Sequence, residues 1–177
     1  MADPQRDGHQ VEGVRALLAA AAARLREAGV PDEAVADLVP ATRRLGITRR
    51  ARLVPVGRGW RLGVLLLGAD GSVRATGSVT RAIPPGHPGH MAASTEARRE
   101  VRAAAHRGPF PQGATVNFDA PRIDLGALGR ATGPLFLRGD RALVRWSVSA
   151  GDDAARDLEA YLAERVDLLL HPPQGAT

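Results

Sequence analysis

The side chains best suited to covalent chemistry follow one another over a short stretch in the middle of the chain. A Pro- and Gly-rich segment at 83–93 contains His87 and His90, and the helix expected next begins at Ser94 and ends at His106. A serine hydroxyl becomes a nucleophile when a neighbouring imidazole accepts its proton. Ser94 with one of the three histidines as its base is therefore the candidate catalytic pair of a small hydrolase. Ser94 is equally well explained as the N-cap of the helix.

The same segment holds the only histidine spacing that suggests a metal. His87 and His90 stand three residues apart, and imidazole nitrogens are common zinc ligands. A Pro/Gly loop does not fix two histidines as a helix would, and no carboxylate lies between residues 71 and 95 to complete a site. The sequence therefore predicts a loop here, with no metal site and no cofactor, and a metal-dependent protein is the weakest of the functional alternatives.

Two residue types are missing, and their absence excludes several classes of site. The 177 residues include no cysteine, which rules out a thiol nucleophile, a disulfide framework, an iron–sulfur cluster and cysteine-ligated zinc. All 24 Lys and Arg positions are arginine, so the chain has no Walker A lysine, no pyridoxal Schiff base and no Ser-x-x-Lys pair. Each of these cations is a planar guanidinium, which suits carboxylate or phosphate partners.

The arginines are concentrated in the middle of the chain. Residues 43–107 hold 13 arginines against Asp70, Glu96 and Glu100, a local net charge of +10, whereas 1–42 carry −3 and 108–177 carry −2. A basic segment between acidic flanks is typical of a protein with an anionic partner, nucleic acid above all. The alternative is a solvated surface whose arginines pair with the acidic ends of the chain. The predicted anion-binding patch consists of Arg43, Arg44, Arg49, Arg50, Arg52, Arg98, Arg99 and Arg102.

The N-terminal part has the pattern of two helices. Residues 1–9 are polar and aperiodic and are expected to form a loose tail, whereas apolar residues recur at helical spacing over 10–28. A glycine then ends this helix and a proline opens a second one over 32–39. The sequence therefore predicts a helical hairpin within 10–42.

The rest of the chain is dominated by strand patterns. Trp60–Leu67 is an apolar run typical of a strand buried on both faces, and Gly57–Gly59 before it is predicted to turn the chain. In the strand expected over 141–148, Trp146 points into the core and Arg145 away from it. The other expected elements are strands at 53–56, 73–80, 114–118 and 134–137, helices at 94–106 and 152–170, and hairpin turns at Asp70-Gly71 and Arg138-Gly139-Asp140.

This element order predicts an α+β fold, because hairpins outnumber β-α-β alternation. We expect an antiparallel sheet of about five to six strands, helices packed on one face and the N-terminal helical hairpin. The length fits a single domain over 10–170, made of the helical element at 10–42 and the sheet and helices at 51–170, with a tail at 171–177. No window approaches the ~20 apolar residues of a membrane span, which favours a cytoplasmic protein that does not bind membranes.

Three stretches, each expected to be a core strand or helix, carry a family resemblance. They are W-R-L-G-V-L-L-L at 60–67, G-P-L-F-L-R-G-D-R-A-L-V-R-W at 133–146 and A-Y-L-A-E-R-V at 160–166. They resemble a family of small proteins of high-GC Gram-positive bacteria that carries the label glutaminase, and the likeness covers residues 43–173. The label implies an amidohydrolase. A serine-dependent glutaminase uses a Ser-x-x-Lys nucleophile, which a chain without lysine does not contain, so the resemblance supplies no catalytic residue.

Two functions therefore stand ahead of the metal-dependent one. The first is a non-catalytic binding module whose arginine-rich 43–107 surface meets a polyanion, such as nucleic acid, or an acidic protein. The second is a small amidohydrolase with a hydroxyl nucleophile and a histidine base. A contiguous arginine face without a deep pocket favours binding, and a concave site that joins a serine or threonine to a histidine favours catalysis.

Overall fold

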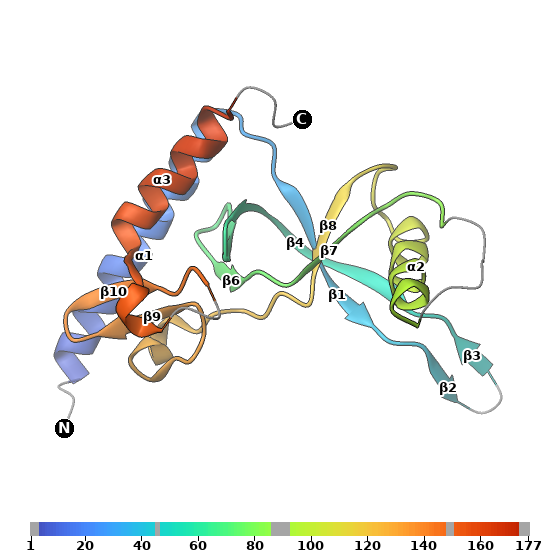
Figure 1. Cartoon of the computed structure of the whole chain (residues 1–177), viewed down its shortest axis with the longest axis horizontal. Helices are drawn as coiled ribbons and strands as arrows, with labels where there is room; N and C mark the ends of the chain where they lie inside the picture. The colour runs from blue at the N-terminus through green and yellow to red at the C-terminus, as the bar shows by residue number, and fades with distance from the viewer. Residues whose placement is uncertain (1–3, 45–46, 86–92, 148–150, 174–177) are drawn as a thin grey trace. The chain divides into compact units, whose positions relative to one another are not determined.

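Figure 1 shows a computed structural model of the chain, in which three helices and eleven strands are assigned within residues 4–44, 47–85, 93–147 and 151–173, the part that the structure describes. The helices are α1 (Pro4–Glu27), α2 (Ala93–His106) and α3 (Leu158–Leu170), with short 3-10 helices η1 (Leu125–Arg130) and η2 (Asp152–Ala154). The strands are β1 (Glu33–Val39), β2 (Thr42–Arg44), β3 (Ile47–Arg49), β4 (Arg52–Leu62), β5 (Leu65–Gly68), β6 (Val73–Ala75), β7 (Ser78–Arg81), β8 (Thr115–Phe118), β9 (Leu135–Arg138), β10 (Arg141–Val144) and β11 (Arg156–Asp157).

The largest sheet has six strands in the order β6-β5-β4-β1-β8-β7. The pairs β1/β4, β5/β6 and β7/β8 are antiparallel, and β1/β8 is parallel. A three-stranded sheet, β11-β10-β9, and a two-stranded ribbon, β2-β3, complete the strands. The protein is therefore an α+β protein with a six-stranded, mostly antiparallel sheet, as the sequence predicts.

Contacts within the chain divide it into two compact units. Unit 1 comprises residues 1–31, 60–76 and 121–177, and unit 2 comprises residues 32–59 and 77–120. Strand β4 crosses from unit 2 to unit 1 between Gly59 and Trp60. Whether residues 10–170 fold as one domain stays a prediction.

Unit 1 is built around α1 and α3, which pack together. Val14, Leu18 and Leu25 recur on α1 at helical spacing and are almost completely buried, as expected for the apolar stripe of an amphipathic helix. They join Trp60 and Leu62 of β4, apolar residues of β5 and β6, and Leu158, Tyr161, Leu162 and Val166 of α3 in one core.

Unit 2 has a smaller core between α2 and its strands. Ala104 and Ala105 of α2 are fully buried, and they share one apolar cluster with Val116 and Phe118 of β8 and Leu53 of β4. Alanine lets the helix approach the sheet closely, so a short helix with few large apolar residues still packs. The opposite side of α2 is left for polar and charged residues.

The prediction of a helix over 32–39 is wrong, because this segment forms strand β1. β1 lies between β4 and β8 in the sheet, and Ala34, Val35 and Ala36 are all buried. A helix this short gains little from its own hydrogen bonds, whereas β1 pairs along its whole length with β4 and at Ala34 and Val35 also with β8. The described part of the chain therefore contains no N-terminal helical hairpin. The first helix is confirmed, but it begins at Pro4 instead of residue 10.

The turn and the buried strand expected over 57–67 are also misplaced. The Gly57–Gly59 segment lies inside β4, where the register against β1 shifts between Pro55 and Gly57 and leaves Val56 as a bulge. The apolar run after it is a tight hairpin, since β4 ends at Leu62, Gly63 has φ +62° and β5 starts at Leu65. Its leucines are nevertheless buried, as predicted.

A second expected strand, 73–80, is split into β6 and β7 at Thr76–Gly77. A Cβ at Gly77 would overlap the backbone carbonyl oxygens of Phe118 and Asp119, so the chain passes its neighbour here without room for a side chain. The hairpin turn predicted at Asp70-Gly71 is confirmed, because β5 and β6 pair across it and Gly71 has φ +77°.

The strand predicted over 141–148 is shorter, and its aromatic residue faces outward. β10 ends at Val144, and Trp146 beyond it is 49% exposed, with its indole Nε1 donating to the carbonyl oxygen of Ala154. Arg145 is instead the more buried side chain, and its guanidinium lies 3.7 Å from the centre of the Phe136 ring. The last helix starts at Leu158 with Asp157 as its N-cap, six residues later than predicted.

Candidate functional site

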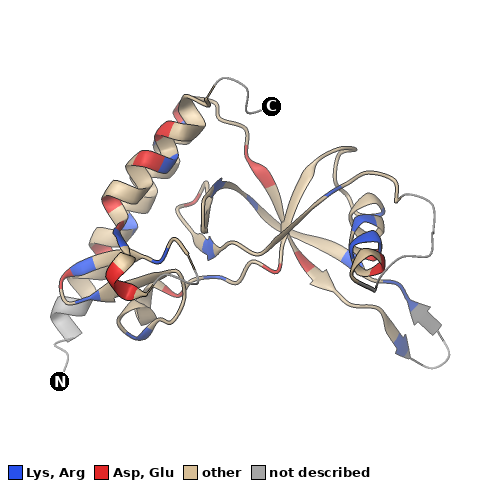
Figure 2. Ribbon diagram, viewed as in Figure 1, with Lys and Arg blue, Asp and Glu red and all other residues tan. Residues whose placement is uncertain are grey.

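The two units differ sharply in charge. Unit 2 holds eleven arginines against six acidic residues, whereas unit 1 holds thirteen of each. The net charge of +5 therefore belongs entirely to unit 2, although Arg61 and Arg74 of the basic 43–107 segment fall in unit 1. Figure 2 shows the acidic residues of α3 and the blue arginine positions of α2.

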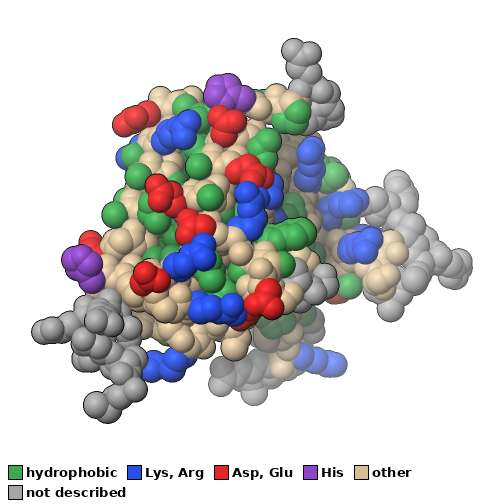
Figure 3. Space-filling view, turned by 60° about the vertical axis from the view of Figure 1, so that its left-hand side comes forward, with side chains coloured by type: hydrophobic (Ala, Val, Ile, Leu, Met, Phe, Trp, Pro, Cys, Tyr) green, Lys and Arg blue, Asp and Glu red, His purple; other side chains and the backbone are tan. Residues whose placement is uncertain are grey.

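In unit 1, several arginines form close ion pairs with neighbouring carboxylates. Asp152 accepts hydrogen bonds of 2.6 Å from both Arg145 and Arg138, and these bonds hold the pKa of its carboxyl below the ordinary value. Other ion pairs join Arg156 to Glu164 and Arg141 to Asp157. Figure 3 shows blue and red side chains intermixed on this face. Such a surface attracts a polyanion weakly at long range.

Helix α2 presents an unneutralised basic face in unit 2. Arg98, Arg102 and His106 are all exposed and follow one another at intervals of four residues, so they lie along one side of the helix. Neither arginine has an ion-pair partner among the described residues. Arg99, also in the predicted patch, is instead held by Glu96 at 2.7 Å, which raises the pKa of the guanidinium and lowers that of Glu96.

The segment before β4 lies against the C-terminal end of this helix. Arg107, directly after α2, donates from its Nη2 to the carbonyl oxygen of Ala51 at 3.1 Å. Arg50 and Arg52 flank Ala51 in the chain, and both are exposed. The structure therefore places Arg50 and Arg52 near the C-terminal end of the helix that carries Arg98 and Arg102, some 50 residues later in the sequence.

The β2-β3 ribbon extends the basic segment. Thr42 pairs with Arg49 and Arg43 pairs with Thr48, so Arg43 and Arg49 lie on opposite faces of the ribbon. Both side chains are exposed. Arg44 belongs to β2, but its side chain lies outside the described residues, so its part in the patch stays a prediction. Six of the eight predicted patch residues are thus exposed arginines of unit 2 with no described ion pair: Arg43, Arg49, Arg50, Arg52, Arg98 and Arg102.

Sequence reasoning missed two further arginines of this unit. Arg107 makes the contact that joins α2 to the segment before β4, and Arg81 is exposed at the end of β7. The position of Arg107 directly after the last turn of the helix was the available signal. For Arg81 the sequence offered none beyond the local excess of positive charge.

Ser94 and His106, one of the candidate catalytic pairs, both lie on α2 but are too far apart to form a hydrogen bond. Ser94 is exposed in the first turn of the helix and His106 is exposed in its last turn, so they are separated by about 18 Å along the helix axis. His87 and His90 lie outside the described residues. Within the part of the chain that the structure describes, no three His, Asp or Glu side chains are grouped as a metal site.

Comparison with known proteins gave no match to a family model, to a curated protein or to a solved structure. Among the described helices, none combines the length and the apolar character needed to cross a membrane.

Proposed function

We propose that unit 2 is a binding module for the phosphate backbone of nucleic acid, with the exposed arginines of 43–52 and 98–107 as its contact surface. The observation that supports the proposal most strongly is the division of charge between the units. The net +5 resides in unit 2, where six exposed arginines have no described carboxylate partner, whereas unit 1 has no net charge and Arg138, Arg145 and Arg156 there form close ion pairs.

Phosphate is the anion that this surface suits best. A guanidinium presents its N–H donors in a planar fork that matches two phosphate oxygens, and it stays charged at any physiological pH. A row of such groups on a helix face and beside it releases several condensed counterions when it meets a duplex, which is the main source of sequence-independent affinity.

The aromatic residues of unit 2 favour duplex over single-stranded nucleic acid. Proteins that bind single strands stack bases on exposed aromatic rings. Unit 2 contains two aromatic residues, of which Phe118 is 7% exposed and Phe110 is half-buried against the core. Base recognition therefore has no stacking surface here, and we expect contacts to the backbone without sequence preference. A cytoplasmic location, expected from the sequence, belongs to this proposal.

The test compares two double variants with the same change of charge. Fluorescence anisotropy measures binding of the full chain to a labelled duplex of about two helical turns at low salt. Arg98→Gln with Arg102→Gln should weaken binding to all duplex sequences alike, since these arginines contact phosphates only. The control, Arg24→Gln with Arg130→Gln, removes two exposed arginines of unit 1 and should leave the affinity unchanged.

Loss of affinity in both double variants alike would mean that net charge alone, and not this surface, governs binding. If the chain binds an acidic protein but no duplex, the same arginines serve a protein partner and the nucleic-acid proposal is refuted. No detectable duplex binding at low salt would leave the arginines as a solvated surface and refute the proposal.

A further inference from the structure

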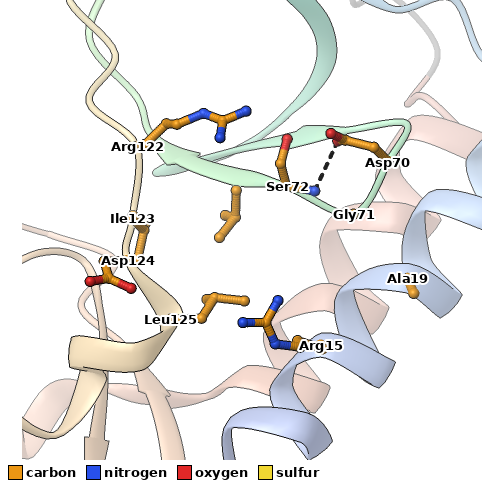
Figure 4. A pocket seen from close by; sticks show the side chains of 10 residues that line it. Arg15, Ala19, Asp70, Gly71, Ser72, Arg122, Ile123, Asp124 and Leu125 are labelled. Carbon is orange, nitrogen blue, oxygen red and sulfur yellow. Dashed lines mark hydrogen bonds between the residues drawn. The ribbon is translucent and has the colours of Figure 1, made fainter.

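Unit 1 contains a cavity of about 660 Å³ that is separate from the arginine surface of unit 2. Three segments line it: α1, the turn between β5 and β6, and residues 122–125. Its volume falls within the range of small-molecule sites in proteins. Figure 4 shows Arg122 near Ser72 at one end of the cavity and Arg15 beside Leu125 at the other.

Apolar side chains form the part of the lining that is not charged. Ala19, Val73, Ile123 and Leu125 contribute to the wall, and Val73 is almost fully buried. A site with an apolar wall and a few charged groups is the usual composition of a pocket for a small organic molecule. The charged groups then fix which end of the molecule lies where.

The two carboxylates of the lining are already engaged by the protein. Oδ1 of Asp70 accepts from the backbone N–H of Ser72 at 3.0 Å, and the Ser72 hydroxyl also bonds this carboxylate, which lowers its pKa. Oδ1 of Asp124 accepts from the backbone N–H of Gly126 at 2.9 Å as the cap of η1. Both aspartates thus have a structural role in the turn that carries them.

The two guanidinium groups, in contrast, have unused donors. Arg122 has no ion pair within 4.0 Å among the described residues, although its charge contributes to lowering the pKa of Asp70, and Arg15 has one weak contact of 4.0 Å to Glu12, whose side chain is 78% exposed. The lining therefore has unmet hydrogen-bonding capacity on the donor side at two points, in addition to the acceptor capacity that remains on the two carboxylates. A ligand that satisfies these donors carries an acceptor, and best an anion, at each point.

We propose that this cavity binds a small organic dianion, with one acid group at Arg122, the other at Arg15 and an apolar chain between them. The lining has two positive and two negative side chains, so long-range attraction is small and recognition depends on the fit of both acid groups. This distinguishes the site from the basic surface of unit 2, which needs neither an apolar wall nor a defined spacing.

A homologous series of dicarboxylates tests the proposal. Isothermal titration calorimetry of the full chain is carried out with succinate, glutarate, adipate, pimelate and suberate, and with monocarboxylates of matching chain length. Affinity should rise to a maximum at one chain length, and the best dicarboxylate should exceed its matching monocarboxylate by about tenfold, because only the dianion reaches both guanidinium groups.

Three variants locate the site. Arg15→Gln and Arg122→Gln should each reduce dicarboxylate binding to the level of the monocarboxylate, and Arg122→Lys should retain part of the affinity through its charge. Arg130→Gln, which changes an arginine of the same unit outside the cavity lining, should have no effect. The three side chains changed, Arg15, Arg122 and Arg130, are all exposed, so equal urea midpoints are expected and will show that each variant is folded.

A flat affinity series, equal binding of monocarboxylates or inorganic phosphate, or indifference to both arginine variants would overturn the proposal. So would the absence of binding at millimolar concentration. The duplex affinity of unit 2 should be the same in Arg15→Gln and Arg122→Gln as in the wild type, so success or failure here is independent of the nucleic-acid proposal.

Discussion

Tyr161 is expected to hold the β4-β5 hairpin in place through its hydroxyl group. The side chain is 1% exposed, and its hydroxyl donates to the carbonyl oxygen of Leu62 at 2.9 Å and accepts from the backbone N–H of Val64 at 3.0 Å. These two backbone groups flank Gly63, the residue at the turn. Tyr161→Phe removes both bonds and leaves the ring in the core.

The cost follows from leaving buried polar groups without partners. A net hydrogen bond contributes about 1 kcal/mol, and an unsatisfied buried donor or acceptor costs about 1–3 kcal/mol. The Leu62 carbonyl is in a buried environment, whereas Val64 is half-buried and water compensates part of its loss. We therefore expect Tyr161→Phe to lower the free energy of unfolding by about 2–3 kcal/mol.

Gly63 provides a second measurement of the same contact. A Cβ at this position would overlap the Tyr161 hydroxyl, and the residue has φ +62°. Gly63→Ala should therefore be destabilising in the wild type and less so in Tyr161→Phe, where the overlap with the hydroxyl is gone. The backbone strain, roughly 1 kcal/mol, and a tight contact of 3.3 Å with the ring carbon Cζ then remain.

Urea unfolding at neutral pH, followed by tryptophan fluorescence, measures these differences because both tryptophans lie in unit 1. Leu168→Ala is the control on the same helix, and since Leu168 is 40% exposed it should change stability by less than about 0.5 kcal/mol. If Tyr161→Phe is no more destabilising than this control, or if its effect and that of Gly63→Ala simply add, the hydroxyl does not hold the hairpin.

Three further predictions concern unit 2, acid stability and catalysis. Gly77→Ala should lower the free energy of unfolding by more than about 2 kcal/mol, because the added Cβ would overlap backbone atoms of Phe118 and Asp119, which cannot move aside as a side chain can. Urea unfolding followed by circular dichroism measures the difference, and a change below about 0.5 kcal/mol would contradict the close approach. Asp152 has a pKa below its ordinary value of 3.8 in the folded state, so its ion pairs stabilise the protein above pH 3.8, and this stabilisation is lost as the pH falls through the folded-state pKa. The free energy of unfolding, measured from pH 5 downwards, should therefore depend less on pH in Asp152→Asn than in the wild type. Identical pH profiles of the two proteins would refute this prediction. The purified protein should release no ammonia from glutamine in a coupled assay, and turnover abolished by Ser94→Ala would instead support the amidohydrolase.

The sequence patterns predicted elements best where the hydrophobic period was long or the turn chemistry specific. The helix over α1 repeats its apolar residues through several turns, and Asp70-Gly71 and Gly139 mark hairpins that are present. The same patterns failed where pairing with neighbouring strands determines the secondary structure of a segment. The sequence of β1 predicts a helix because seven residues with two alanines carry little periodicity, and only pairing with β4 and β8 makes them a strand.

The sequence pattern also misplaced two strand ends, because each depends on structure that the pattern does not contain. The run 60–67 holds a turn because the Tyr161 hydroxyl, about 100 residues away in sequence, bonds the backbone on both sides of Gly63. Trp146 lies outside the core because β10 ends at Val144, so the alternation of the strand no longer applies to it.

The charged surface was predicted in its composition but not in its grouping. Charge counting identified the basic segment, yet only the structure places Ala51 against Arg107 at the end of α2, and only it shows that Arg99 is paired with Glu96. The cavity of unit 1 was not predicted, since Arg15 and Arg122 are too distant in sequence for any spacing to connect them.

The salt dependence of duplex binding tests the central proposal most directly. Arg43 and Arg49 lie on opposite faces of the β2-β3 ribbon, so one duplex meets at most five of the six exposed arginines of unit 2. If these five neutralise phosphates, the logarithm of the affinity should fall with the logarithm of salt concentration with a slope of roughly −4.5, since each contact contributes about −0.9. Removing Arg98 and Arg102 should make that slope shallower by about 1.8, whereas removing Arg24 and Arg130 should leave it unchanged. A wild-type slope near zero, or the same slope in all three proteins, would contradict the assignment of this surface to phosphate binding.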